Sequence, residues 1–452
     1  MVSLRFFGGV GEIGGNKILL EDGDTRVWLD FGRSFDSGAD YYTSYLQPRG
    51  IAGLKDYFEF DLLPRLDGLY SEEMLQETDT QYKPPTFDGI LISHSHSDHV
   101  GHLGFVDPSI PVYTGAGTKL FMEASEETST VNLGNHAYRG FRSGAKLNIG
   151  CLEVCPIHVD HSVPGAYGFI IHTSAGAIVY TGDLRAHGPK ADMTEEFLEA
   201  ASGAKPVAMI SEGTRLTPND HRQNHSEQQV YNGVVEVCGK PGNRGRLVLY
   251  THGPRDMDRL RTFYTASVVS DRKIVISPRT AYLLSKLVHD EHLDLPDSAH
   301  DENIAVYYRR KKSGSYDETD YYKWERPFLD KIVTPADLKK DPGRYMVNVD
   351  FSSMTELVDI RPERGTPFVY SMSEHFAEED VEGVVLQNWI RHFGLGYVQL
   401  HASGHIGRGE LSEAIVRVSP TRLFPVHTEH PEMFKELYRG SVQTEKGKVY
   451  TI

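Results

Sequence analysis

The sequence predicts an α/β protein that combines two kinds of structure. Short apolar runs joined by glycine-rich turns dominate the first part of the chain, which is typical of β-sheets. From about Gly213, runs with helical periodicity alternate with short buried strands, which indicates a parallel sheet covered by helices. Histidines and aspartates recur where apolar runs end, and this pattern favours a metal site.

Composition limits the class of protein. The chain has 452 residues, enough for two domains, and its three cysteines cannot form a disulfide framework. We expect a cytoplasmic protein without membrane contact, because no apolar run can span a bilayer and no secretory signal pattern opens the sequence. The net charge of −16 argues against broad attraction to nucleic acid but leaves room for a local basic channel.

The first elements are strands. LRFFG, KILLE and RVWLDFG are apolar runs within residues 1–35, and GGVGEIGGN joins the first two. This glycine-rich segment lacks the Lys-Ser or Lys-Thr ending of a phosphate-binding loop, so a hairpin turn is favoured. Residues 36–85 form a long tyrosine-rich insertion, in which 54–70 has the spacing of one or two short helices.

The strand GILIS is followed directly by His94-Ser-His96-Ser-Asp98-His99. Alternate side chains of an extended chain share one face, so His94, His96 and Asp98 can converge. Asp98 also suits the cap of a helix beginning near Val100, which would turn His99 inward. Three imidazoles and one carboxylate this close together are typical of zinc ligands, with ordinary surface histidines as the alternative.

Further candidate ligands lie at the ends of other apolar runs. They are His158 and His161, Asp183, His401 and His405, and His427 and His430. A single histidine is more often a surface or core residue, but strand ends gather at one rim of a sheet, where sites form. The residues alone do not choose between His158 and His161, or between His427 and His430.

The order of these motifs after Asp30 resembles the metallo-β-lactamase superfamily over nearly the whole chain. The resemblance implies an αββα sandwich with two zinc ions, or manganese in their place. Asp30 would orient the histidine loop rather than bind metal. The implied ligands are His94, His96 and His161 for one ion, Asp98, His99 and His427 for the other, and Asp183 as the bridge.

A long segment separates Asp183 from His427, and small hydrolases of the superfamily lack it. In this the chain resembles the β-CASP branch, whose members process RNA or DNA. The resemblance implies an inserted α/β domain within the sandwich domain, and 36–85 has no counterpart that we can place. The expected division is residues 1–212 and 401–452 for the metallo-β-lactamase domain and 213–400 for the β-CASP insert.

Three further motifs of that branch match Glu212 in AMISEGT, His405 in HASGH and His427 in PVHTE. The DNA-acting group typically has valine at the third position, so His427 favours RNA. GGVGEIGGN, HASGH and PVHTE are similar to ribonuclease J and related nucleases of archaea and bacteria. Thr428 departs from the glycine that is usual in those enzymes.

The implied activity is zinc-dependent hydrolysis of RNA phosphodiester bonds, with 5′-to-3′ exonuclease action favoured and endonuclease action left open. The metal ions would activate a water and neutralise the phosphate. His405, hydrogen-bonded to Glu212, would protonate the leaving 3′ oxygen. The expected catalytic residues are Asp98, Asp183, Glu212 and His405. The resemblance also implies a homodimer.

The HASGH loop gives a hypothesis for substrate binding. In ribonuclease J the equivalent loop binds a 5′-monophosphate nucleotide, so the resemblance assigns this role to His401, Ser403 and Gly404. The alternative is a tight turn between two domains. Tyr321, Tyr322 and Trp324 are candidates for stacking on bases, with packing of long loops as the favoured alternative.

Two basic segments are candidates for an RNA channel, with a solvated charged face as the alternative. They are Arg309 to Lys312, and Arg255, Arg259 and Arg261. Three rival functions also fit: a small-molecule hydrolase, a DNA nuclease, and a non-catalytic subunit of a processing complex. The long insert with Glu212 and His405 argues against the first, His427 argues against the second, and the complete ligand set argues against the third.

Overall fold

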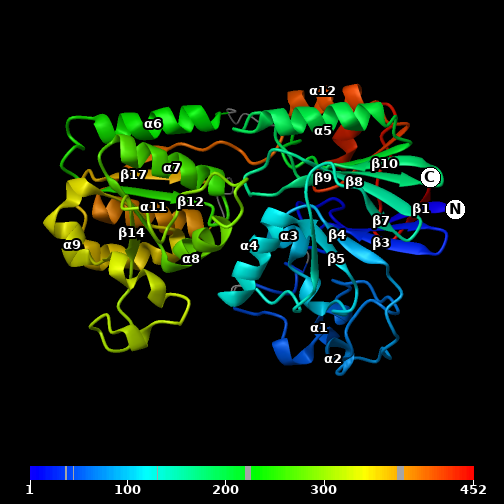
Figure 1. Cartoon of the computed structure of the whole chain (residues 1–452), viewed down its shortest axis with the longest axis horizontal. Coiled ribbons are helices and arrows are strands. Elements are labelled where there is room, and N and C mark those ends of the chain that lie inside the picture. The colour runs from blue at the N-terminus through cyan, green and yellow to red at the C-terminus, as the bar shows by residue number, and fades with distance from the viewer. Residues whose placement is uncertain (36–37, 44, 130, 219–224, 374–380) are drawn as a thin grey trace. The chain divides into compact units, whose positions relative to one another are not determined.

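The computed structural model describes all residues except 36–37, 44, 130, 219–224 and 374–380. The chain divides into two compact units (Figure 1). Unit 1 consists of residues 1–186, 190–222 and 404–452, and unit 2 consists of 187–189 and 223–403. Unit 2 is therefore an insertion in the chain of unit 1. Residues 213–222, which the sequence analysis assigns to the insert, group with unit 1, and 401–403 group with unit 2.

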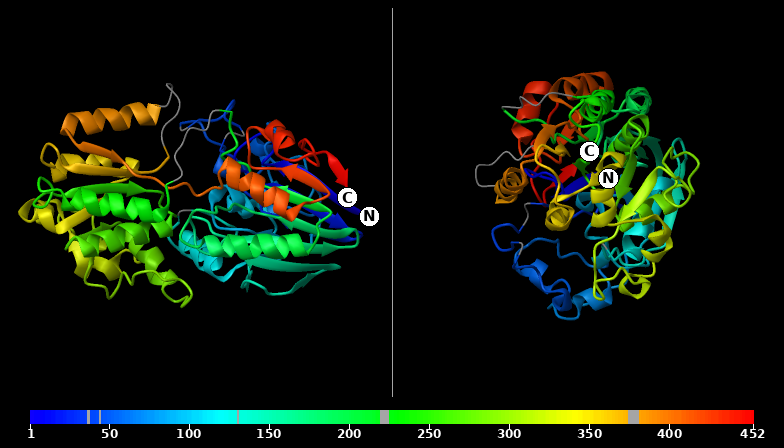
Figure 2. Two further views of the ribbon diagram at one scale, coloured as in Figure 1. Left: turned by 90° about the horizontal axis from the view of Figure 1, so that it is seen from above. Right: turned by 90° about the vertical axis from the view of Figure 1, so that its left-hand side faces the viewer.

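Unit 1 contains two sheets. The seven-stranded sheet has the order β20-β1-β2-β3-β4-β5-β6, with antiparallel pairing from β20 to β3 and parallel pairing from β3 to β6. Its strands are β1 (Val2–Gly8), β2 (Lys17–Asp22), β3 (Thr25–Leu29), β4 (Gly89–Ile92), β5 (Val112–Gly115), β6 (Tyr138–Phe141) and β20 (Val449–Thr451). Because β20 pairs with β1, the two ends of the chain lie side by side (Figures 1 and 2).

The six-stranded sheet has the order β19-β11-β10-β9-β8-β7. Its strands are β7 (Leu147–Ile149), β8 (Leu152–His158), β9 (Tyr167–Thr173), β10 (Gly176–Tyr180), β11 (Ala208–Ser211) and β19 (Arg422–Pro425). The strands β7 to β10 are antiparallel neighbours, whereas β10, β11 and β19 are parallel. Parallel strands end at the same edge, which places the residues after β10, β11 and β19 together.

Unit 1 has the αββα order that the resemblance implies. Leu4 of β1 and Tyr180 of β10 share a buried core between the sheets. The helix α4 (Ala116–Glu127) covers the outer face of the first sheet, where Met122 packs in the same cluster as Trp28. Two helices, α5 (Ala191–Gly203) and α12 (Arg408–Val418), cover the outer face of the second sheet.

The insertion at 36–85 packs on the outer face of the first sheet. Its described part contains η1 (Gly50–Ala52), α1 (Lys55–Glu59) and α2 (Glu72–Leu75). Phe58 and Tyr70 are buried in the cluster that holds Trp28. The insertion therefore has an apolar anchor on unit 1 instead of a separate core.

Unit 2 is a parallel sheet with helices on both faces. Its strand order is β15-β14-β13-β16-β12-β17-β18. These strands are β12 (Val248–His252), β13 (Lys273–Ile276), β14 (Ile304–Tyr307), β15 (Ile332–Val333), β16 (Tyr345–Asn348), β17 (Pro367–Ser371) and β18 (Gly396–Gln399).

Adjacent residues of β12 show the two covered faces of this sheet. Tyr250 packs its ring on Phe263 of α7 at 4.4 Å, while Leu249 packs with Leu386 of α11 on the other face. The main helices are α6 (Glu227–Gly239), α7 (Met257–Val269), α8 (Pro278–Leu287), α9 (Pro335–Lys340) and α11 (Val381–Phe393). Across the described part of the chain, we find no helix with the length and apolarity needed to cross a membrane.

Candidate metal centre

The histidine motif lies where β4 ends, and its backbone turns at once into the short helix α3 (Ser97–Val100). The expected helix start near Val100 is wrong, because amides of His99 and Val100 already donate to the carbonyl of His96. Asp98 therefore lies in the first turn and does not cap the helix. His99 is buried, as the sequence predicts.

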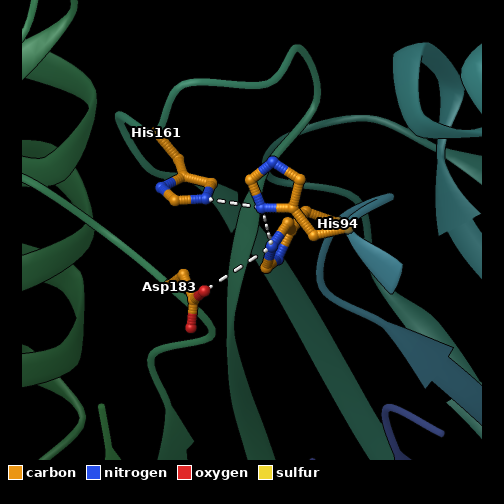
Figure 3. Close-up of side chains that lie close together, drawn as sticks. His94, His161 and Asp183 are labelled. Atoms are coloured by element: carbon orange, nitrogen blue, oxygen red, sulfur yellow. Dashed lines mark hydrogen bonds and ion pairs between the residues drawn. The ribbon is translucent and has the colours of Figure 1, made fainter. Parts of the chain in front are cut away.

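The first group of candidate ligands contains His94, His96, His161 and Asp183, whose ligand atoms all lie within 4.8 Å of one another. His96 Nδ1 is 3.0 Å from His94 Nε2 and 3.2 Å from His161 Nε2. Asp183 Oδ2 lies 3.6 Å from His94 Nε2. Figure 3 shows the side chains of His94, His161 and Asp183 pointing toward a common centre.

The second group contains Asp98, His99, Asp183 and His427, again within 4.8 Å. His427 Nε2 is 2.8 Å from Asp98 Oδ2, although 329 residues separate them in the chain. Asp183 Oδ2 lies 3.2 Å from His99 Nε2 and 3.6 Å from His427 Nε2. Asp183, which follows β10, is thus common to both groups.

Several polar atoms at this centre lack the hydrogen bonds that burial normally requires. Within the described residues, neither carboxylate oxygen of Asp183 accepts a hydrogen bond, and His99 Nε2 makes none of acceptable geometry. Both side chains are fully buried. A buried carboxylate that accepts no hydrogen bond is costly unless a cation binds it. The buried His and Asp cluster is therefore able to bind metal ions.

Asp30 holds His99 in position from behind. Its carboxylate accepts hydrogen bonds from the Ser93 amide (2.7 Å), the Ser93 hydroxyl (2.7 Å) and the Tyr180 hydroxyl (2.6 Å). The same carboxylate lies 2.7 Å from His99 Nδ1. A proton on Nδ1 leaves the lone pair of Nε2 facing Asp183, which is the tautomer that a metal ligand needs.

The electrostatics of the two groups differ in the absence of bound cations. Burial and neighbouring imidazoles hold the pKa of His94 and of His161 well below the ordinary value, so both rings are neutral at pH 7. Burial opposes protonation of His99 as well, but Asp183 and Asp30 outweigh it and raise its pKa. The second group therefore gathers the negative charge that a cation would neutralise.

The histidine alternatives that the sequence left open are separated by their contacts. His161 Nδ1 lies 2.6 Å from the carbonyl of Gly404, which directs Nε2 to the cluster. His158 instead packs its ring on Tyr167 at 4.3 Å. His430 contacts Glu432 at 3.1 Å, in a partly exposed position away from the two ligand groups. The geometry thus brings His161 and His427 to the centre.

Glu212 and His405 form a pair beside the cluster. His405 Nδ1 lies 3.0 Å from Glu212 Oε2 and 3.8 Å from Asp183 Oδ2. Burial alone would lower the pKa of His405, but Glu212 and Asp183 outweigh it and raise the pKa to about 9. The side chain of His405 is 22% exposed, whereas that of His427 is 1% exposed, so His405 faces more open space.

Thr214 is a contact that the sequence analysis missed. Its hydroxyl lies 2.7 Å from Glu212 Oε2 and 2.8 Å from His427 Nδ1, so it connects the Glu212 pair to the metal cluster. A second hydrogen bond to Glu212 comes from the Leu184 amide at 2.7 Å. The position of Thr214 just after β11 was the only sequence signal, and threonine is common in such turns.

The HASGH loop spans the division between the two units. His401 and Ser403 group with unit 2, where the Ser403 carbonyl lies 3.1 Å from His187 Nε2. Gly404 groups with unit 1, and a Cβ added there would lie 3.3 Å from His161 Cε1. A substrate role for these residues stays a prediction.

The basic segments of unit 2 are largely paired with carboxylates. Lys311 contacts Glu325 at 2.7 Å, and Arg310 contacts Asp359 at 2.9 Å. The guanidinium of Arg259 is fully buried against Glu227 at 2.7 Å, so it is not available to a channel surface. These pairs support the alternative of a solvated charged face for Arg310 and Lys311.

The aromatic cluster of unit 2 is also divided. Tyr321 is 2% exposed and packs against Tyr308, which supports the favoured alternative of loop packing over base stacking. Tyr322 is 68% exposed and stacks on Trp324 with ring centroids 6.0 Å apart. Packing within the loop therefore accounts for Tyr321.

The two-sheet sandwich and its strand-end ligand groups define a metallo-β-lactamase fold, and residues 66–252 match the family model described as the beta-lactamase superfamily domain. The predicted fold class and the resemblance to this superfamily are confirmed. A crystal structure titled as a protein of unknown function from Enterococcus faecalis V583 has the same fold, with a TM-score of 0.77 over 100% of both chains and 21% identity.

Curated relatives carry the name ribonuclease J. The relative from Sinorhizobium meliloti is 26% identical over 354 residues, covering 75% of this chain and 57% of its own length. The relative from Thermus thermophilus is 23% identical over 451 residues, covering 95% of this chain and 69% of its own. Ribonuclease J 2 from Streptococcus pyogenes is 24% identical and is covered over 49% of its length. The chain thus spans about half the length of the relatives from Sinorhizobium meliloti and Streptococcus pyogenes.

Proposed function

We propose that the protein is a two-zinc ribonuclease that hydrolyses RNA phosphodiester bonds, acting as an exonuclease from the 5′ end. The observation that carries the proposal is the sharing of Asp183 by two groups of candidate ligands, with the His405 and Glu212 pair beside them. The similarity to proteins named ribonuclease J supports RNA as the substrate. The same similarity underlies the proposal that the protein forms a homodimer.

The ligand set suits zinc. Imidazole nitrogens and carboxylate oxygens are the donors that zinc takes in catalytic sites, and manganese accepts the same carboxylates. Two such cations supply Lewis acidity and lower the pKa of a nearby water, which is the chemistry that phosphodiester hydrolysis requires. The proposed ligands are His94, His96 and His161 for one cation, Asp98, His99 and His427 for the other, and Asp183 for both.

The chain itself supplies the proton for the leaving group. Glu212 accepts from Leu184 and Thr214 and is therefore fixed as the partner of His405. The raised pKa keeps His405 protonated at neutral pH, so Nδ1 donates to Glu212 and Nε2 retains a second proton. We assign that proton to the leaving 3′ oxygen, with Glu212 as the residue that positions the ring.

The 5′ end of the substrate is assigned to the HASGH loop. His401, Ser403 and Gly404 would bind a terminal monophosphate, as the equivalent loop of ribonuclease J does. A Cβ at Gly404 would crowd His161 and Ser162, so a side chain here would press on a candidate metal ligand. A substrate with a 5′-monophosphate should therefore be degraded faster than one with a 5′-hydroxyl.

The experiment that tests the function is a time course on single-stranded RNA labelled at either end. Each RNA is supplied with a 5′-monophosphate, a 5′-triphosphate or a 5′-hydroxyl, and the metal content of the purified chain is measured in parallel. Mononucleotides released first from the 5′ end support the proposal. Internal fragments as the first products would indicate endonuclease action instead of exonuclease action. Cleavage of β-lactams, thioesters or DNA with intact RNA would refute the ribonuclease, and a chain without bound metal would favour a non-catalytic subunit.

A further inference from the structure

Unit 1 contains a cavity of about 240 Å³ that none of the candidate metal ligands lines. Its walls come from the glycine-rich turn after β1, the segment after β3, the insertion and the turn before β20. The residues that matter for its chemistry are Glu12, Lys17, Arg33, Phe35, His102 and Lys446. The cavity thus depends on the insertion, whose described residues supply none of the candidate metal ligands.

The cavity gathers positive charge with little to neutralise it. Lys17 is 2% exposed, and its ammonium donates to the Gly15 carbonyl at 3.1 Å, although it can donate three hydrogen bonds. In the described part of the chain no carboxylate pairs with Lys17 or Arg33 within 4.0 Å. Glu12 is the acid of the cavity wall, and it already accepts from Gly9 and Ser34.

Burial is unfavourable for the ammonium of Lys17. It lowers the pKa of Lys17 to about 7, with Lys446 lowering the pKa further and Glu12 partly compensating. A buried ammonium with a single carbonyl partner costs free energy, and a bound anion would offset that cost. Lys17, Arg33 and Lys446 together therefore favour a ligand with more than one negative charge, such as a phosphate group.

An exposed aromatic ring at the same cavity favours a larger ligand than inorganic phosphate. His102 also lines the cavity, but it is 6% exposed and its Nδ1 is buried, so we assign it no contact with the ligand. Phe35 is 64% exposed at the cavity, and an exposed ring of this kind stacks readily on a base.

We propose that this cavity binds a nucleotide, with its phosphate on Lys17, Arg33 and Lys446 and its base against Phe35. The volume of about 240 Å³ equals the share of roughly eight water molecules in liquid water. That space holds a phosphate and part of a sugar, so the base lies at the mouth.

The nucleotide has two possible sources with the same chemistry. It is either a free mononucleotide, which includes the expected product of the reaction, or one nucleotide of an RNA chain on its way to the metal centre. The second source rests on the proposed function, whereas the first does not. The insertion then has a purpose in either case, since it supplies one wall of the cavity.

The test is calorimetric titration of the full purified chain with adenosine 5′-monophosphate, adenosine and inorganic phosphate. We expect the monophosphate to bind more tightly than either fragment. Arg33→Ala and Lys17→Met should each weaken its binding about tenfold, because each removes one charged contact worth roughly that factor. Phe35→Ala should weaken the monophosphate but leave inorganic phosphate unchanged. Arg65→Ala is the control, since Arg65 lies in the same insertion and pairs with Asp79 on the surface.

The outcomes separate the two sources and expose a failure. A higher KM for RNA with unchanged kcat in Arg33→Ala and Phe35→Ala assigns the cavity to the RNA chain. Unchanged RNA kinetics with weakened monophosphate binding assigns it to a free nucleotide. Equal monophosphate affinity in wild type and all three cavity variants overturns the proposal. Absence of RNA cleavage would refute the proposed function alone, because the titration needs no turnover.

Discussion

The metal centre and the cavity beside the insertion both concentrate polar groups inside unit 1. Carboxylates that contact one another's partners characterise the metal centre, whereas basic side chains with few contacts characterise the cavity. In the metal centre, carboxylates and imidazoles from four strand ends are held by one another and by Asp30. In the cavity, Lys17 and Arg33 make few contacts and face open volume. The comparison teaches that the first site is organised before a cation arrives, whereas the second depends on an anion to satisfy its charges.

The largest effect is expected from Asp183→Ala, because Asp183 is common to both ligand groups. Substitution of a residue that only orients a metal ligand lowers the metal affinity about 10 to 100-fold, so substitution of a shared ligand should lower it further. We expect loss of bound metal, measured by elemental analysis, and loss of RNA cleavage with it. Asp24→Ala, at an exposed turn, should change neither. Full metal content in Asp183→Ala would remove the basis for a two-cation site.

The next effect separates proton transfer from metal binding at the same centre. His405→Ala should lower kcat by about 10² to 10⁴-fold, the usual contribution of a general acid, and should leave metal content unchanged. His430→Ala is the matched control, because His430 is another partly exposed histidine but pairs with Glu432. Loss of metal in His405→Ala would make His405 a ligand, as its place in a third group with Asp183 and Glu212 would allow.

A smaller effect tests how far the metal centre is organised in advance. In Asp30→Asn the amide can still accept from Ser93 but no longer offers a carboxylate to His99 Nδ1. We expect the metal affinity to fall about 10 to 100-fold, measured by competition with a chelator. Asp107→Asn, whose carboxylate accepts from Ser109 at a turn outside the ligand groups, should leave it unchanged. An unaltered metal affinity in Asp30→Asn would show that the histidine loop keeps its conformation without the contact between Asp30 and His99.

The smallest effect concerns the cavity and the pH dependence of stability. The pKa of Lys17 is about 7 in the folded chain and 10.5 as its ordinary value, so the unfolded chain binds more protons between these pH values. The free energy of unfolding of the wild type should therefore increase as pH rises from about 7 to about 10. Below about pH 7 Lys17 is protonated in both states, and its burial then destabilises the folded chain to the full extent. The groups facing Lys17 are Glu12, Lys446 and His102.

Lys17→Met should remove this gain. The variant should be more stable than wild type at pH 7 by roughly 1 to 3 kcal/mol. The full pKa shift would correspond to more than this, at about 1.4 kcal/mol per pKa unit, but water in the cavity reduces the effect. Urea unfolding at several pH values measures the difference. Arg65→Ala should keep the wild-type slope. If the free energy of unfolding depends on pH in the same way in Lys17→Met and in wild type, the lowered pKa of a buried Lys17 would be contradicted.

The sequence predicted the metal centre better than its surroundings. His94 and His96 follow a strand as alternate residues, so their convergence could be predicted, whereas Asp98 lies in the helix α3 and joins His99 and His427 instead. The residues alone could not choose His161 over His158, since the choice depends on a carbonyl at Gly404, which is 243 residues away; the family resemblance supplied it. Thr214 escaped for the same reason, because its partner His427 is 213 residues away.

The cavity was hidden from the sequence for a different reason. The sequence correctly predicts that GGVGEIGGN forms the turn between β1 and β2. The same prediction places Lys17 in an ordinary strand and gives it no special role. Lys446 and the insertion reach the same place only in the folded unit, where the Lys446 ammonium lies 3.3 Å from the Asp61 carbonyl. A cluster assembled from three distant segments has no local pattern to detect.

The 329-residue separation of Asp98 and His427 has a consequence for how the molecule is made. Synthesis from the N-terminus delivers the whole of unit 2 before β19 and His427 emerge, and domains generally fold as they emerge. A growing chain can thus complete its inserted unit while the second cation still lacks a ligand. For the nuclease that we propose, destructive chemistry is then withheld on the ribosome, beside the messenger being read, until the last segment has been added.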